Sequence, residues 1–153
     1  LVGSIAVHLS RDLALQDELR RQPQLIPAAV EEFLRLYTPY RGFARTAVCD
    51  VEFGGRKIPA GEPIALVYAS ANRDEAVFPE GGTFRLHRPN LGDHLAFGRG
   101  PHNCPGASLG RLELRVSLEE LLARTTRFEL NGEIVPTRFP EIGALSVPLR
   151  LES

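Results

Sequence analysis

Cysteine and methionine are scarce in this chain of 153 residues. It has two cysteines, Cys49 and Cys104, outside any Cys-x-x-Cys pair, and no methionine. A disulfide framework and an all-cysteine zinc site are therefore unsupported, and a reducing cytoplasm is favoured. Cys49, in the strand-like AVCDVEF, is interpreted as a packing residue. Because LVGSIAVHL opens without a helix start signal, we interpret Leu1 as an internal position of a longer protein.

The chain also lacks a strong net charge and a long apolar run. Its 18 basic and 19 acidic residues give a formal net charge of −1. No global field therefore favours nucleic acid or an anionic membrane as a partner. No stretch approaches the ~20 apolar residues that span a bilayer, and the start does not match a signal peptide. We predict a soluble, cytoplasmic single domain with no nucleic-acid and no membrane partner.

Hydrophobic spacing predicts three helices and several short strands. Apolar residues recur at helical spacing over 5–20, 24–37 and 107–124. Short β-prone runs between 44 and 68 predict strands of a small sheet, and RFEL with LSVPLRL predicts a closing hairpin. Residues 69–94 have many turn formers and little periodicity. We expect a mainly α fold with small β-sheets, in the α+β class.

The stretch FGRGPHNCPG, residues 97–106, presents Cys104 in a loop. Gly98 and Gly100 allow backbone conformations closed to other residues, and two prolines restrict the chain, so helix and strand are both excluded. A predicted helix follows directly. Because the amides and dipole at a helix N-terminus stabilise a thiolate, Cys104 is predisposed to be a nucleophile or a metal ligand.

Three chemistries use a cysteine or a glycine-rich loop of this kind. A Cys–His nucleophile pair with His102 is disfavoured, because residues two apart in a tight loop rarely aim at each other. A dinucleotide-binding glycine loop fails at Asn103, where the third glycine of G-x-G-x-x-G should stand. An axial thiolate to a flat iron cofactor fits better, because glycines let the backbone lie against a planar ring. The other histidines, without ligand spacing, are His8, His87 and His94.

The loop resembles the haem-binding loop of the cytochrome P450 superfamily in its bacterial soluble members. The family pattern is F-G-x-G-x-H-x-C-x-G, and the matching residues are Phe97, Gly98, Gly100, His102, Cys104 and Gly106. The resemblance implies haem b, iron protoporphyrin IX, as cofactor, with Cys104 as the iron ligand. The implied cofactor-binding residues are Arg45, Phe97, Gly98, His102, Cys104 and Gly106. Arg45 and His102 would hold the propionates, with Arg41 as the rival to Arg45.

The resemblance also implies a buried ion network. VEEFLR supplies Glu32 and Arg35 at i,i+3 on one helical face. Taken alone, such a pair is a solvated surface salt bridge. In the family, this pair joins an arginine from the irregular segment, in a structural network under the haem-binding loop. FRLHRP offers Arg88 at the matching position, with Arg85 as the alternative, and this role would explain the irregular segment.

Two kinds of partner are implied by the same resemblance. A ferredoxin-type or flavoprotein electron donor would dock on the side of the cysteine ligand, where Arg99, Arg111 and Arg115 lie. The alternative is that these arginines form the solvated face of a helix. A small organic substrate would be contacted by residues 40–44 and 141–144.

The implied activity is that of a haem-thiolate monooxygenase, which inserts one oxygen atom from O2 into a small organic substrate with electrons from a redox partner. Because family members are far longer, we expect residues 1–153 to be the C-terminal haem-binding portion. The N-terminal part and the distal oxygen-handling helix would be absent, so no catalytic residue is expected in this chain. Two alternatives stay open: a non-catalytic haem-binding or sensing module, and a degenerate remnant that binds partners.

Overall fold

The structure, a computed structural model that describes all residues 1–153, combines helices with short paired strands. The helices are α1 (Val2–Arg11), α2 (Leu13–Arg21), α3 (Ile26–Leu36), α4 (Tyr68–Ala71) and α5 (Ala107–Arg124). The strands are β1 (Phe43–Thr46), β2 (Val51–Phe53), β3 (Arg56–Ile58), β4 (Pro63–Leu66), β5 (Arg127–Leu130), β6 (Val135–Pro136), β7 (Ala144–Ser146) and β8 (Leu149–Glu152). The predicted α+β class, mainly helical with small sheets, is confirmed.

Residues 5–20 form parts of two helices, so the expectation of a single helix was wrong. The backbone of Asp12 leaves the helical region, with φ −119° and ψ 81°. Its carboxylate accepts the backbone N–H of Leu15 at 3.0 Å and caps the start of α2. The break lets both helices turn apolar faces into one core, where Leu9 and Leu19 have no exposed surface.

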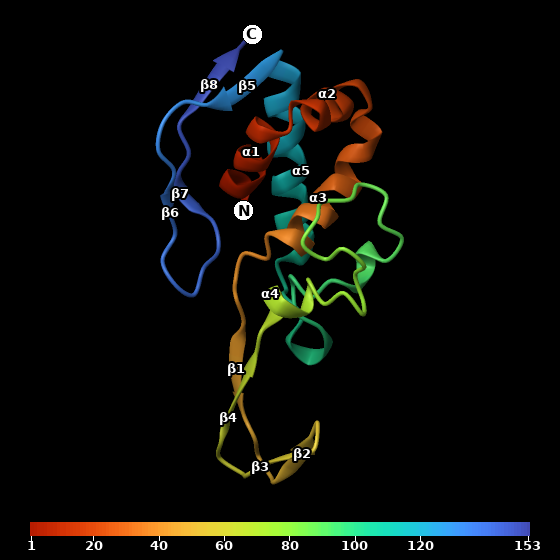
Figure 1. The fold of residues 1–153 in the computed structure, drawn as a ribbon, viewed down its shortest axis with the longest axis vertical. Coiled ribbons are helices and arrows are strands. Elements are labelled where there is room, and N and C mark those ends of the chain that lie inside the picture. The colour runs from red at the N-terminus through yellow and green to blue at the C-terminus, as the bar shows by residue number, and fades with distance from the viewer.

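Helix α3 lies at the centre of the helical body, between α5 and the irregular segment (Figure 1). A 3-10 turn at 23–25 precedes it, and Pro27 is tolerated because it falls in the first helical turn. Eight of its eleven residues are buried. These include Glu32 and Arg35, so this helix carries an ion pair into the core.

Helix α5 has the predicted bounds, but only some of its apolar residues are buried. The buried leucines are Leu114, Leu118 and Leu122, each exposed by 7% or less. The apolar residues left exposed are Leu109, Leu112 and Val116, at 59%, 48% and 42%. Apolar residues thus lie on two sides of this helix. Their spacing predicts the helix, whereas contact with α3 and α2 decides which of these residues are buried.

The segment 44–68 forms two separate antiparallel ladders rather than one sheet. Strand β1 pairs with β4, and β2 pairs with β3 across a turn at Gly54 and Gly55, both with positive φ. Figure 1 shows these ladders as an arm that extends from the helical body. Cys49 lies exposed between β1 and β2, so its interpretation as a packing residue was wrong. A two-stranded arm has no second layer to bury it.

The predicted closing hairpin is confirmed as the pairing of β5 with β8, and a second ladder joins β6 to β7. Phe128 in β5 is fully buried in the core. The buried Gln16 side chain donates to the Phe128 carbonyl at 2.8 Å and accepts its N–H at 3.3 Å, which ties this ladder to α2. None of the helices is both long enough and apolar enough to cross a membrane.

We expect Leu118→Ala to lower the free energy of unfolding by about 2–5 kcal/mol, because it opens a cavity between α5 and the core. Leu109→Ala, on the exposed side of the same helix, is the matched control and should cost less than about 0.5 kcal/mol. Urea unfolding followed by circular dichroism measures both. Equal losses in the two variants would contradict the packing of α5.

Candidate functional site

A buried ion network joins α3 to the irregular segment. Arg35 donates to both carboxylate oxygens of Glu32, from Nε at 2.7 Å and from Nη2 at 2.8 Å. Arg88 donates from Nε to Glu32 Oε1 at 3.2 Å, and the three side chains are 2% exposed or less. The side chain of Arg85 instead pairs with Glu80 at the surface. The structure therefore brings together Glu32, Arg35 and Arg88, as the sequence resemblance suggested.

The remaining guanidinium N–H groups of this network hold the irregular segment by its backbone. The carbonyls that accept from Arg35 belong to Asn72, Gly81 and Thr83, at 2.6, 2.7 and 3.1 Å. Those that accept from Arg88 belong to Pro79, Glu80 and Thr83, at 2.6, 3.3 and 3.1 Å. These bonds offset the cost of burying the two guanidinium groups, because each of their nitrogen atoms donates to an acceptor in the irregular segment or in Glu32.

Asn72 connects the ion network to the segment that leads into the cysteine loop. Its side chain has no exposed surface. Its Oδ1 accepts the backbone N–H of Leu95 at 2.6 Å, and its Nδ2 donates to Thr38 Oγ1 at 2.7 Å. No sequence motif predicted a role for this asparagine. Composition carries no signal for it, because its partners lie 23 and 34 residues away.

The cysteine loop is closed at its base by one backbone hydrogen bond. The N–H of Cys104 donates to the carbonyl of Phe97 at 2.8 Å. Between them, Gly98 and Gly100 take positive φ values of 69° and 76°, which side chains other than glycine disfavour. A 3-10 turn over 100–102 follows, and α5 begins three residues after Cys104. The loop thus presents a partly buried thiol just ahead of a helix N-terminus.

The thiol of Cys104 lines a pocket of about 460 Å³ between the loop and the arm. The lining residues are Pro39, Tyr40, Phe43, Arg45, Tyr68, Ala96, Phe97, Gly98, His102 and Cys104. Tyr40 stacks on Phe43 with ring centroids 5.5 Å apart, and these aromatic rings form part of the wall. Arg41 lines a different pocket, with Arg73 and Asp74. The structure therefore places Arg45, rather than its rival, together with the cysteine.

The groups in this pocket suit a flat iron cofactor with carboxylate substituents. One thiol faces largely apolar walls, and the basic side chains Arg45 and His102 share the pocket with it. A Cβ on Gly98 would lie 3.4 Å from the His102 carbonyl and 3.8 Å from the Tyr68 hydroxyl, and one on Gly106 would lie 3.8 Å from the sulfur. Bare backbone at these two positions leaves room beside the thiol.

A second polar cluster lies between α3 and α5. Glu31 accepts from Arg111 Nε at 2.6 Å and Nη2 at 3.0 Å, and its Oε2 lies 2.9 Å from His94 Nε2. Burial raises the pKa of Glu31, but hydrogen bonds from His94 and Arg111 and the Arg111 charge outweigh it and lower the pKa to about 2. No sequence pattern predicted this cluster, because His94 and Arg111 lie 63 and 80 residues from Glu31.

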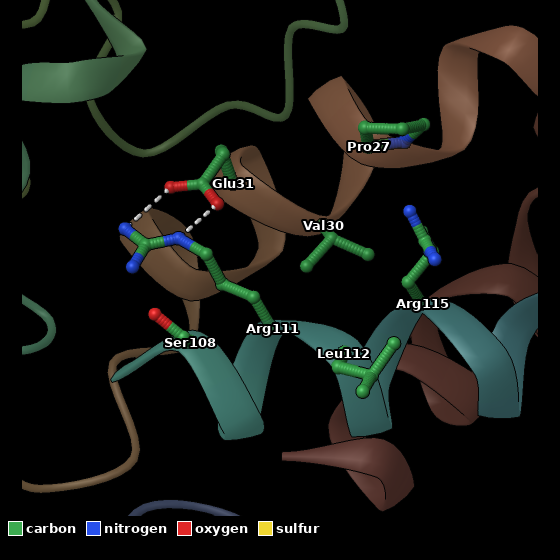
Figure 2. Close-up of a pocket in the computed structure, with 7 residues that line it drawn as sticks. All are labelled: Pro27, Val30, Glu31, Ser108, Arg111, Leu112 and Arg115. Atoms are coloured by element: carbon green, nitrogen blue, oxygen red, sulfur yellow. Dashed lines mark hydrogen bonds and ion pairs between the residues drawn. The ribbon is translucent and has the colours of Figure 1, made fainter. Parts of the chain in front are cut away.

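The three arginines assigned to partner docking differ in how they are held. Arg111 is engaged by Glu31, and its guanidinium lies 4.6 Å from the centroid of the Phe97 ring. Arg99 and Arg115 are 65% and 47% exposed, and each makes one long ion pair at 3.6 Å. Figure 2 shows Arg111 and Arg115 at opposite sides of a groove of about 270 Å³, with Leu112 between them.

The two segments assigned to substrate contact lie side by side. Tyr40 and Glu141 form a β-bridge, and the N–H of Ile142 donates to the Pro39 carbonyl at 2.7 Å. Tyr40 and Phe43 also line the cysteine pocket, whereas none of residues 141–144 does. The first segment therefore has direct access to that pocket.

The sequence profile described as Cytochrome P450 matches residues 5–151. The chain belongs to the cytochrome P450 family. It is 40% identical over 151 residues to cytochrome P450-terp of a Pseudomonas species. This alignment covers 97% of this chain and 35% of the relative. The chain is 41% identical over 129 residues to linalool 8-monooxygenase of Pseudomonas putida, covering 84% of this chain and 32% of the relative. This P450 chain thus spans about a third of these relatives.

Solved structures of P450 proteins share its fold. The structure of cytochrome P450-153 from Novosphingobium aromaticivorans matches with a TM-score of 0.89 and 41% identity, over 96% of this chain and 38% of that one. This agreement confirms the family resemblance drawn from the cysteine loop and the mixed helical and strand architecture.

We expect Arg35→Met to lower the free energy of unfolding by about 3–5 kcal/mol, because it removes a partner of a buried carboxylate and leaves the carbonyls of Asn72 and Gly81 without their guanidinium donor. Arg85→Met removes an exposed ion pair in the same region and should cost at most about 1 kcal/mol. Chemical denaturation of both variants makes the comparison. Similar costs would show that the ion network does not support the fold.

Proposed function

We propose that this chain binds haem b through the thiolate of Cys104 and forms the haem-binding portion of a monooxygenase. The observation that carries the proposal is the pocket in which this thiol meets aromatic walls and two basic side chains. A relative named linalool 8-monooxygenase supports the reaction class. The reaction would insert one oxygen atom from O2 into a small organic substrate, and a cytoplasmic location is part of the proposal.

The residues of the pocket have distinct roles in this proposal. Cys104, three residues before the start of α5, would donate its thiolate to the iron. Arg45 and His102 would pair with the two propionates through charge-assisted hydrogen bonds. Phe97 would pack against the macrocycle, while Gly98 leaves the backbone free to approach it. When bound, haem supplies the redox chemistry of oxygen activation.

Substrate binding is assigned to the segment that enters β1. Tyr40 and Phe43 present aromatic faces to the pocket that holds Cys104, so they would contact an apolar part of a small organic substrate. The neighbouring segment 141–144 supports this wall through the β-bridge to Tyr40. It would act by fixing the position of the first segment.

The electron donor would dock on the face formed by the cysteine loop and the first turns of α5. Arg99 and Arg115 are exposed and only weakly paired there, so they are free to meet acidic side chains of a ferredoxin-type or flavoprotein donor. The groove beside Leu112 in Figure 2 offers an apolar strip between the charges. Arg111 contributes less, because Glu31 already neutralises it.

The haem proposal is tested by a difference spectrum of the haem-loaded protein, reduced and exposed to carbon monoxide. We expect a strongly red-shifted Soret band that is lost in Cys104→Ala, because only a thiolate ligand produces that shift. Cys49→Ala removes the other, exposed cysteine and should leave the band intact. A band that survives in Cys104→Ala would overturn the assignment. Haem bound through Cys104 with the iron left open to solvent would favour a non-catalytic haem-binding or sensing module, and stable folding without haem would favour a partner-binding remnant.

The docking proposal predicts that Arg115→Glu weakens binding of a reduced [2Fe–2S] ferredoxin by about tenfold at low salt, with a smaller effect at high salt because exposed charges are screened. Arg124→Glu reverses a similar exposed charge at the other end of α5 and serves as the control. Titration of the holoprotein with the ferredoxin measures both affinities. Equal effects of the two reversals would refute docking on this face.

A further inference from the structure

We propose that Glu31 is a positioning residue for Cys104 and acts by clamping both ends of the cysteine loop. One carboxylate bonds to His94, three residues before the loop, and to Arg111, in α5 just after it. The inference rests on the proposed haem ligation by Cys104. The positioning role that it gives to Glu31 is separate from that of the ion network of Glu32.

On one side of the clamp, Arg111 connects Glu31 to the cysteine through Phe97. Glu31 holds the guanidinium by two hydrogen bonds, at 2.6 and 3.0 Å, which fixes the plane of the group. That plane covers the Phe97 ring, with 4.6 Å from Cζ to the ring centroid. The carbonyl of Phe97 in turn accepts the N–H of Cys104 at 2.8 Å. Four residues thus form one continuous chain of contacts from the carboxylate to the ligand.

On the other side of the clamp, His94 fixes the segment that leads into the loop. His94 Nδ1 accepts the N–H of Ala96 at 3.2 Å, so the neutral ring carries its proton on Nε2 and donates it to Glu31 at 2.9 Å. The His94 side chain is 3% exposed and that of Glu31 is 24% exposed. The bond between His94 and Glu31 is therefore largely shielded from water, and it stabilises the structure more than the bond of a surface pair does.

Asn72 fixes the chain ahead of the loop independently of Glu31, so loss of the clamp need not unfold this region. Asn72 accepts the N–H of Leu95 with its side chain and a guanidinium N–H of Arg35 with its carbonyl, and neither bond involves Glu31. Loss of Glu31 would therefore leave the path of the chain intact up to Leu95. It would free the Phe97 ring and, through it, the pose of the Cys104 backbone. The expected defect is in thiolate ligation rather than in folding.

The decisive variant is Glu31→Gln in the haem-loaded protein, because glutamine keeps the size but cannot neutralise Arg111 and accept from His94 together. We expect haem transfer to an excess of a haem-accepting protein to become about tenfold faster, in line with losses seen when outer-shell partners of a metal ligand are removed. Part of the reduced carbon monoxide band should lose its red shift. Glu120→Gln removes a carboxylate from an exposed pair on α5 and should change neither readout.

Arg111→Lys provides an independent variant. It keeps the charge but loses the planar fork that bonds to Glu31 and covers Phe97, so it should reproduce the spectral change of Glu31→Gln. Wild-type haem transfer and an unchanged band in both variants would overturn the clamp. Loss of helical circular dichroism in both, at a temperature where Glu120→Gln is folded, would also overturn it, because the carboxylate would then be a structural cross-link. A wild-type band that does not depend on Cys104 would instead refute the proposed haem ligation itself.

Discussion

A carboxylate with no exposed surface must be neutralised where it lies, and this constraint at Glu32 governs much of the structure. Arg35 supplies one positive charge from the same helix, and Arg88 supplies another from a segment without regular secondary structure. Neutralising the carboxylate therefore also fixes the path of that segment. The two guanidiniums donate to its backbone carbonyls, so side chains supply hydrogen bonds that this stretch does not make as helix or strand.

The position of the cysteine loop depends on this ion network. Arg35 holds the carbonyl of Asn72, and the Asn72 side chain holds the N–H of Leu95, just ahead of the loop. Within the loop, positive φ at Gly98 returns the chain so that the Cys104 N–H meets the Phe97 carbonyl. The thiol is thus placed by a series of short contacts that starts in the core, while the pocket in front of it stays largely apolar.

Arginine does this work because of its shape as well as its charge. Only one of the 18 basic residues is a lysine, Lys57. Arg35 makes five hydrogen bonds and Arg88 four, to carboxylate and carbonyl oxygens that lie in different directions. At Arg111 the flat guanidinium both bonds to a carboxylate and covers an aromatic ring. An ammonium group, which is compact and strongly hydrated, satisfies neither geometry.

The sequence by itself determined what short-range chemistry controls: the bounds of α5, the closing hairpin, the glycine-rich form of the loop and the family to which it belongs. The tertiary structure alone decided which stripe of α5 is buried, and that Arg45 rather than Arg41 shares the pocket with Cys104. It also decided the partners of Asn72 and Glu31, which lie tens of residues away. Local propensity acts over a few residues, whereas burial and ion pairing depend on which distant segments meet in space.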